Sequence, residues 1–599
     1  MFLSMTIDLA PSLKTIPFLK DTPARALRAA GREATWFSLR AGSPLFQAGE
    51  TADSIHFVLS GSLGVFRPLG DGQTKFIGHI RAGEPAGEMA LFSGGQEHTN
   101  APHSSSVYAL RDSEILSISR AGFDRLIKAE PDILQRMIRM ILLRLRQSGR
   151  RSARAEPKVF TLVATSPTID LATRADTLKR TLQGMGLRAI IIDKQQGEDK
   201  PSSYFDAMEA ANDVVILTSQ LGDNGWYQLA TRQADRIWIF GRADAVPSDP
   251  ILPRDTSPAR QFKLVDVVLL HHGREQMRAT PGQWLAAAGG ARLFHWTGVK
   301  GRDCARLARV MSGRSVGLVL SGGGARAFAH IGLVRALRER GIPIDFAGGT
   351  SMGAVIAACV AMGWDDAEID RRIRKAFVET NPLGDYTLPV VGMVRGKRVD
   401  RRLKEHFGDA MIGDLELPFF AISTNLSDGA FRVHRSGFVR HALRASISLP
   451  GILPPVVDDG EVLVDGGVLN NFPVDVMQGL HRGYIVGCDV SRDRQGFPSN
   501  EFEDPPGFLS WVWKNGFSRT PPIASLLMRS ATIAVNHTAG REQSDVCILP
   551  DLADLELRDW DTYDPAVEAG YEATIAALDA SPHMLSHQAL RMPMATAAE

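Results

Sequence analysis

The sequence predicts a multidomain α/β protein in which a β jelly roll precedes two α/β units. A chain of 599 residues with 44% hydrophobic and 23% charged side chains is too long for a single core. Short alternating segments broken by glycine turns extend from about residue 35 to 118, which favours a jelly roll or barrel. Apolar, β-branched runs then alternate with helix-like stretches, first over 157–295 and again from Ser315. This alternation is typical of parallel sheets covered by helices.

We place the first domain at residues 15–130 and a helix with a basic linker at 131–156. Apolar side chains recur in that helix at steps of three and four residues. They are Ile133, Leu134, Met137, Ile138, Ile141, Leu142 and Leu145. The segment 157–295 is expected to be Rossmann-like. Its strands are followed by no G-x-G-x-x-G and its first turn has no glycine cradle, so a structural or docking role is favoured over a nucleotide site.

Global composition excludes several classes of partner. Sixty-eight basic and 67 acidic residues leave a formal charge of +1, which does not steer the chain toward nucleic acid. The N-terminus lacks a basic signal region, and no apolar run reaches the roughly 18 residues that span a bilayer. We therefore expect a cytoplasmic protein that contacts membranes at most peripherally. Four distant cysteines without metal-ligand spacing predict reduced thiols, and we expect no metal or cofactor.

The first candidate for chemistry is a glycine-rich loop. The apolar strand that starts at Ser315 runs into Ser321-Gly322-Gly323-Gly324 and then into a helical stretch. Glycines at a helix N-terminus let backbone N–H groups point outward, where they bind an anion. The loop is suited to a phosphate or an oxyanion, although a tight turn without a ligand explains it equally well.

A second motif lies between the next apolar strand and an apolar helix. Gly349-Thr350-Ser351-Met352-Gly353 fits the G-x-S-x-G elbow, in which a strained turn exposes the serine hydroxyl at the end of a sheet. The alternative is a serine that only caps the following helix. As a nucleophile Ser351 needs a neighbouring base.

The base is expected to be a carboxylate. His330 has the pattern of a packed or capping residue, and His434, His441 and His481 have no neighbours that indicate a triad. Asp465 instead ends an apolar strand and is followed by two glycines, so its carboxylate could reach the serine directly as general base. An ordinary Asp-Gly turn is the alternative.

Four motifs in this order resemble the patatin-like phospholipases: SGGGARAFAHIG, GTSMG, RASISLPGILPPV and LVDGGVLNNFPV. The resemblance implies a patatin-like domain of the α/β hydrolase type at 315–480, with 481–599 as a C-terminal extension. It implies Ser351 as nucleophile, Asp465 as base, and an oxyanion hole near Arg326 formed by Gly322, Gly323 and Gly324. Ala327 departs from the family, which often has glycine there.

The first domain resembles the cyclic nucleotide-binding fold through Gly49-Glu50, the run 57–62 and the stretch 86–91. In that family a glutamate at the position of Glu88 holds the ribose, and an arginine holds the cyclic phosphate. Here His103 occupies the arginine position. An imidazole lacks the permanent charge and bidentate geometry of a guanidinium, so we expect a degenerate nucleotide pocket at Glu88 and His103. The following helix often pairs two subunits in this fold, which implies a homodimer.

Together the two domains resemble the neuropathy target esterase group of lysophospholipases. The resemblance implies a serine esterase that hydrolyses fatty-acyl esters of (lyso)phospholipids without a metal. Two alternatives stay open: a ligand-sensing regulatory protein with a silent hydrolase scaffold, and an acyltransferase. Members of the group in animals and yeast carry an N-terminal membrane anchor, which this sequence is expected to lack. Two features are suited to membrane contact. The aromatic cluster Trp511, Trp513 and Phe517 could enter the headgroup region, the alternative being rings packed over the catalytic domain. A basic cluster could meet anionic lipid, the alternative being a solvated linker; it consists of Arg144, Arg146, Arg150, Arg151 and Arg154.

Overall fold

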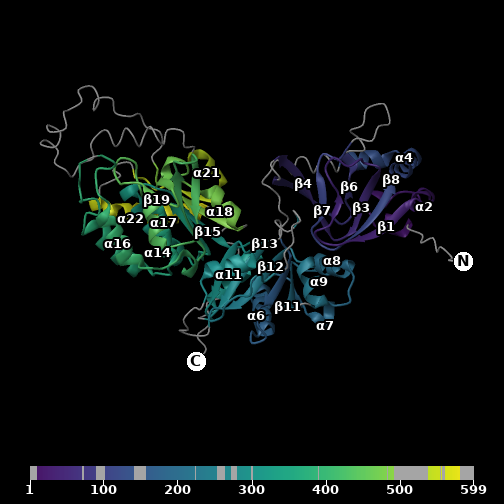
Figure 1. Ribbon diagram of the computed structural model, residues 1–599, viewed down its shortest axis with the longest axis horizontal. Helices are drawn as coiled ribbons and strands as arrows, with labels where there is room; N and C mark the ends of the chain where they lie inside the picture. The colour runs from purple at the N-terminus through teal and green to yellow at the C-terminus, as the bar shows by residue number, and fades with distance from the viewer. Residues whose placement is uncertain are drawn as a thin grey trace, which may run out of the picture. The chain divides into compact units, whose positions relative to one another are not determined.

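The computed structural model separates the chain into two compact units, Met1–Ala279 with Trp284–Ala291, and Thr280–Gln283 with Arg292–Glu599 (Figure 1). It describes residues 10–580 except for 71–72, 90–101, 140–156, 223, 253–258, 260–263, 272–278, 299–300, 389, 482, 492–536, 553–554 and 556–559. The aromatic cluster at 511–517 and the arginines at 144–154 therefore lie outside the described residues.

The first unit begins with two antiparallel four-stranded sheets, the predicted jelly roll. One has the order β1 (Ala34–Leu39), β8 (Ser113–Ser119), β3 (Ser54–Ser60), β6 (Pro85–Ala86). The other has the order β2 (Pro44–Phe46), β7 (Ser106–Ala109), β4 (Ser62–Gly70), β5 (Gln73–Arg81). Ile55 and Phe57 are fully buried against the flanking helical elements. These are α1 (Ala10–Lys14), η1 (Pro17–Leu19), α2 (Ala24–Gly31), α4 (Arg120–Ala129) and the helical residues 132–139.

A parallel α/β layer follows in the same unit. Its strands lie in the order β10 (Ala189–Ile192), β11 (Val214–Gln220), β9 (Val159–Ala164), β12 (Arg236–Arg242), β13 (Leu264–Leu270). All six residues of β9 are buried, as expected for a strand covered on both faces. The helices are α6 (Leu171–Gly184), α7 (Lys194–Gly197), α8 (Ser202–Ala211), α9 (Gly225–Gln233) and α11 (Pro281–Ala288).

An ion cluster joins the jelly roll to this layer. Arg111, in the turn before β8, is buried and forms salt bridges with Glu209 and Asp235. The Asp235 carboxylate also accepts the backbone N–H groups of Lys158 and Val159 at 2.9 and 3.0 Å. One arginine thus compensates two carboxylates at the start of β9.

The second unit is built on an eight-stranded sheet, preceded by β14 (Arg292–Trp296). Strands β15 (Val316–Leu320), β16 (Phe346–Thr350), β17 (Phe419–Asn425), β21 (Tyr484–Cys488) and β22 (Val546–Ile548) pair in parallel. Antiparallel strands complete one side: β18 (Ala430–His434), β19 (Val456–Asp458) and β20 (Glu461–Asp465). The helical elements are α12 (Arg302–Met311), η2 (Gly324–Phe328), α13 (Ala329–Glu339), α14 (Met352–Ala361), α15 (Asp366–Ile373), η3 (Arg374–Val378), α16 (Lys397–Phe407), η4 (Ile412–Asp414), α17 (Val439–Ser446), η5 (Gly466–Val468), α18 (Val474–Leu480), α21 (His537–Gln543), η7 (Trp560–Thr562) and α22 (Tyr563–Ala580).

The sheet and core of this unit continue beyond residue 480, where the motifs end. Strands β21 and β22 extend the sheet, and α22 packs against α13. The crossing is close because both helices present glycine: a Cβ on Gly332 would lie 1.8 Å from the Val567 carbonyl oxygen, and one on Gly570 1.9 Å from that of Ala329. Parts of 481–599 are thus integral to the fold that carries the motifs, rather than an appendage to it.

Candidate active site

The glycine loop leaves β15 and enters η2 at the carboxyl edge of the sheet. Side chains are excluded there by crowding, since a Cβ on Gly322 would lie 2.5 Å from Asn471 Oδ1 and one on Gly323 2.4 Å from Val490 Cγ2. Gly324 has a φ of +58°, which glycine adopts without strain. Arg326 follows in η2 and is buried.

Ser351 lies in the sharp turn between β16 and α14. Its φ of +54° is one of only two positive values among the described non-glycine residues, as the strained elbow requires. The turn is tight because Gly349 and Gly353 both approach the end of β15: a Cβ on either would lie 2.4 Å from the Leu320 carbonyl oxygen. The serine backbone N–H donates to Ser446 Oγ at 2.8 Å.

Asp465 ends β20 and faces this serine. In the sheet register Ser423 of β17 is opposite Asp465, and β17 also pairs with β16, which carries Ser351 at its end. Ser351 Oγ donates to Asp465 Oδ2 at 2.7 Å, and Gly467 N–H donates to Oδ1 at 2.8 Å. The structure therefore brings together the predicted nucleophile and base, from positions 114 residues apart.

The environment makes Asp465 more basic than an exposed carboxylate. Burial raises its pKa to about 6, against the opposing hydrogen bonds from Ser351 and Gly467. Only 1% of Asp465 and 7% of Ser351 is exposed. Desolvation disfavours the charged form of a carboxyl group without a nearby cation. A carboxylate with this pKa is ionised at neutral pH and still accepts a proton readily.

The three glycines of the loop are not equivalent. Gly322 donates its backbone N–H to the Asn471 carbonyl oxygen at 3.2 Å. Within the described chain we find no acceptor for the backbone N–H groups of Gly323 and Gly324. The N–H groups of Gly323 and Gly324 therefore differ from that of Gly322, which is already engaged by Asn471.

Two residues that support the site were not singled out from the sequence. Ser446 fixes the elbow through the Ser351 N–H, and Asn471 holds the glycine loop, since its Nδ2 also donates to the Gly322 carbonyl oxygen at 3.2 Å. Both lie inside quoted motifs, RASIS and LNNF. Their side chains were overlooked because serine and asparagine are common in turns and only tertiary contacts distinguish them.

The histidines are engaged elsewhere. His330 Nε2 lies 2.9 Å from the Ser321 carbonyl oxygen, and burial lowers its pKa to about 4. His434 contacts Ser423 Oγ and His481 contacts Ser315 Oγ, while His441 lies beside Arg440. In the described part of the chain none of them is hydrogen-bonded to Ser351 or Asp465.

The predicted nucleotide-pocket residues are both buried in the jelly roll. Glu88 and His103 are each 7% exposed, and a Cβ on Gly87 would lie 3.4 Å from His103 Cε1. The His103 ring stacks on Phe46 with centroids 3.7 Å apart. Burial lowers the His103 pKa, which favours the neutral imidazole, although Glu50 and Asp53 oppose the shift. Part of the cassette between them, residues 90–101, is outside the description, as is part of the predicted dimer helix.

Comparison with known proteins places these two sites in a family. Residues 318–477 match the patatin-like phospholipases, and residues 36–130 match the cyclic nucleotide-binding domain. An uncharacterized NTE family protein of Mycobacterium tuberculosis is 31% identical over 96% of this chain and 98% of its own length. The chain belongs to the NTE family. Through its patatin-like phospholipase domain, this NTE family chain is a carboxylic ester hydrolase.

More distant relatives of this NTE family chain are longer. Patatin-like phospholipase domain-containing protein 6 of Homo sapiens is 26% identical over 90% of this chain, which spans 44% of that protein. A lysophospholipase of Aspergillus terreus is 27% identical over 90% of this chain and 41% of its own length. Among solved structures, the catabolite activator protein of Thermus thermophilus matches 28% of this chain and 68% of its own, with 21% identity and a TM-score of 0.20.

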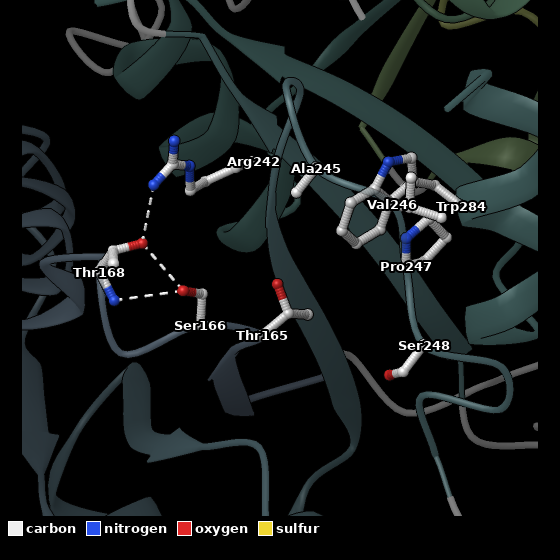
Figure 2. Close-up of a pocket in the computed structure, with 9 residues that line it drawn as sticks. All are labelled: Thr165, Ser166, Thr168, Arg242, Ala245, Val246, Pro247, Ser248 and Trp284. Carbon is white, nitrogen blue, oxygen red and sulfur yellow. Dashed lines mark hydrogen bonds between the residues drawn. The ribbon is translucent and has the colours of Figure 1, made fainter. Parts of the chain in front are cut away.

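A separate cavity of about 300 Å³ lies in the middle α/β layer, at the carboxyl ends of β9 and β12 (Figure 2). Arg242 reaches its edge, but Asp244 accepts from the guanidinium Nε and Nη2, and Thr168 Oγ1 accepts from Nη1. Asp170 caps the N-terminus of α6 and accepts the Thr173 N–H. This geometry is unlike a phosphate cradle, because the arginine charge is compensated and the helix end already has a carboxylate.

Neither a metal site nor a membrane-spanning helix is found among the described residues. No group of three or more His, Cys, Asp or Glu residues suited to a metal ion occurs within the described residues. The described helices also include none that is long and apolar enough to cross a bilayer.

Proposed function

We propose that the second unit hydrolyses fatty-acyl esters of lysophospholipids and phospholipids, with Ser351 as nucleophile and Asp465 as general base. The observation that carries the proposal is the 2.7 Å hydrogen bond between the strained elbow serine and a buried carboxylate. The match to the patatin-like phospholipases and the similarity to a fungal lysophospholipase support the substrate class.

In the acylation step Asp465 takes the hydroxyl proton while Ser351 Oγ attacks the ester carbonyl carbon. The carbonyl oxygen becomes negative, and the backbone N–H groups of Gly323 and Gly324 stabilise it, with Gly322 held in place by Asn471. The C–O bond of the ester then breaks, and the proton on Asp465 goes to the leaving glycerol oxygen. An acyl-enzyme on Ser351 and the deacylated lipid alcohol result.

Deacylation repeats the same proton transfers with water. Asp465 takes a proton from water as its oxygen attacks the acyl carbonyl, and it returns that proton to Ser351 Oγ as the fatty acid leaves. In this proposal the nucleophile, the base and the oxyanion donors are all residues of the chain. An alcohol in place of water would give acyl transfer, which the product distinguishes from hydrolysis.

The test combines labelling with turnover. The protein should react with a fluorophosphonate probe and release fatty acid from lysophosphatidylcholine in the presence of EDTA. Ser351→Ala should lose both activities. Ser312→Ala is the matched control, because Ser312 is the C-cap of α12 in the same unit and its hydroxyl donates to the backbone carbonyl oxygens of Ala308 and Arg309. Activity that survives Ser351→Ala would refute the mechanism.

A further inference from the structure

A loop of the second unit between η3 and α16 exposes three apolar side chains. Leu388, Val390 and Val391 are 79%, 89% and 63% exposed, and we call these three side chains the apolar tip. Single exposed apolar residues are common on protein surfaces, but a run of large ones at a loop tip marks an interaction site. Because these side chains are mostly exposed to solvent, they are not part of the hydrophobic core.

The base of the loop is hydrogen-bonded to residues 446–454, a segment that contacts both Ser351 and Asp465 and is here called the dyad segment. Met393 and Val394 donate backbone N–H groups to the carbonyl oxygens of Gly451 and Ile452 at 3.0 and 3.1 Å. The same segment begins with Ser446, which accepts the Ser351 N–H. Its Ser448 carbonyl accepts the Asp465 N–H at 2.9 Å. Backbone hydrogen bonds thus connect the apolar tip to both members of the dyad.

Helix α16 follows the loop and is amphipathic. Val399, Leu403 and Phe407 are buried, whereas Lys397, Arg401 and Lys404 recur at helical spacing on an exposed face, here called the basic face. These three side chains form no ion pair within the described part of the chain.

The nearby acidic side chains do not neutralise the basic face. Asp400 pairs with Arg444, and Glu405 pairs with Lys375 and Arg402. Arg444 also donates to the Ser448 hydroxyl and to the Pro454 carbonyl, so it fastens α16 to the dyad segment. The stretch from the loop through α16 therefore carries an apolar tip and a basic face that has no ion pair among the described residues, and hydrogen bonds connect it to the segment beside the dyad.

We propose that the apolar tip and the basic face together dock the enzyme on the surface of an anionic lipid bilayer. Apolar side chains that enter the headgroup region beside lysines and arginines are the chemistry of peripheral membrane binding. Docking through this surface would bring the dyad to ester lipids in the membrane. This role in catalysis rests on the proposed function. The binding itself does not require catalysis.

The experiment measures vesicle binding of the full chain in the Ser351→Ala background, where no lipid is consumed. Co-sedimentation should be strong with phosphatidylcholine vesicles containing phosphatidylglycerol and weak with phosphatidylcholine alone. Val390→Asp should lower the partition coefficient about ten-fold or more, since it replaces an apolar side chain by a charge. Lys397→Gln and Arg401→Gln should each lower it about five-fold, on anionic vesicles only.

Leu69→Asp is the matched control. Leu69 is 59% exposed in the first unit, so the substitution is equally tolerable but lies outside the proposed surface. Its binding should equal that of the parent protein. Equal binding by the Val390→Asp and parent proteins would overturn the proposal. So would a dimer in the absence of lipid that Val390→Asp dissociates while vesicle binding stays unchanged, because the surface would then join two copies.

A failure of the proposed function gives a different pattern. If the protein with an intact Ser351 hydrolyses no ester but the Ser351→Ala protein binds vesicles through the apolar tip, docking stands and the catalytic assignment falls. In an active enzyme, Val390→Asp should reduce the ratio of the rate on vesicles to the rate on a soluble short-chain ester by about the same ten-fold factor as binding.

Discussion

Two aspartates, one in each unit, show how a carboxylate's surroundings decide its use. Burial alone would raise the pKa of both. At Asp235 the charge and hydrogen bonds of Arg111, with two backbone N–H groups, reverse the effect and lower the pKa. At Asp465 only a hydroxyl and one backbone N–H oppose burial, and the pKa rises to about 6.

The difference lies in the counter-charge. A buried carboxylate beside a guanidinium is stabilised as an anion and acts as a structural anchor, because removing either partner leaves an uncompensated charge. A buried carboxylate without a cation is a stronger base and costs stability whenever it is ionised. The buried ion cluster of the first unit is therefore an anchor, whereas the buried carboxylate of the second unit has the basicity that the proposed proton transfer needs.

The largest expected effect is on catalysis. Asp465→Asn keeps the shape of the side chain but cannot accept the serine proton, so kcat/KM on lysophosphatidylcholine should fall about 10³-fold or more. The control is Asp428→Asn, which alters an exposed turn carboxylate of the same unit. Steady-state fatty-acid release measures both. A fall of less than ten-fold would show that another group is the base.

The Arg111 cluster should respond in stability instead. Arg111→Met leaves two carboxylates without their cation and should destabilise the first unit by about 3 kcal/mol. Arg188→Met is the control, since Arg188 and its partner Asp213 are largely exposed and should contribute about 1 kcal/mol at most. Hydrogen exchange of β9, compared with β15, measures the change. Faster exchange in β15 than in β9 would contradict this assignment.

Removing the charge of Asp465 should stabilise the protein, whereas removing the charge of Arg111 should destabilise it. Its folded pKa of about 6 exceeds the ordinary 3.8, so ionisation in the fold costs up to about 3 kcal/mol above pH 6 and nothing below about pH 4. Asp465→Asn removes this cost. The variant should therefore unfold at a higher temperature than the parent at neutral pH, and the gain should vanish as the pH falls to about 4. A loss of stability at neutral pH would indicate a hidden counter-charge.

The rate should follow the same ionisation. Only the ionised carboxylate accepts the Ser351 proton, so kcat/KM should rise with pH through a midpoint near 6. Between pH 8 and pH 5 we expect roughly a ten-fold decrease. A soluble short-chain ester separates this ionisation from membrane binding. A profile that is flat down to pH 5 would remove Asp465 as the titrating base.

The smallest effect is expected in the jelly roll. Because His103 is stacked on Phe46 and burial favours its neutral form, cyclic AMP should bind weakly and change the hydrolysis rate by no more than a few-fold. If the ligand drives protonation of His103, the affinity should rise as the pH falls from 8 to 6, because an imidazolium regains part of the missing attraction for the phosphate. Calorimetry at both pH values, with His103→Arg as the comparison, measures this. Tight binding by the parent protein would mean that another residue pairs with the phosphate.

Much of the site was predictable because its motifs depend on local backbone geometry. A serine between small residues after an apolar strand, and an aspartate before two glycines, each restrict the chain over a few residues. Ser446 and Asn471 were not predictable in this way, since their hydrogen bonds to Ser351 and Gly322 join distant segments. The participation of β22 and α22 in this unit could not be predicted either, because neither carries a motif: β22 joins the sheet by pairing with β21, and α22 packs against α13.

The sequence by itself determined the order of the domains and the identity of the predicted nucleophile and base. These follow from residue type, spacing and periodicity, which are local properties of the chain, and from the four motifs that resemble the patatin-like phospholipases. That His103 stands in the place of a phosphate-binding arginine is implied only by the resemblance of the first domain to the cyclic nucleotide-binding fold. Only the tertiary structure decided which carboxylate is basic and which is an anchor. That depends on burial and on whether a cation from a distant segment, such as Arg111, packs beside it, and the electrostatic energy of an ion pair is a function of distance in space.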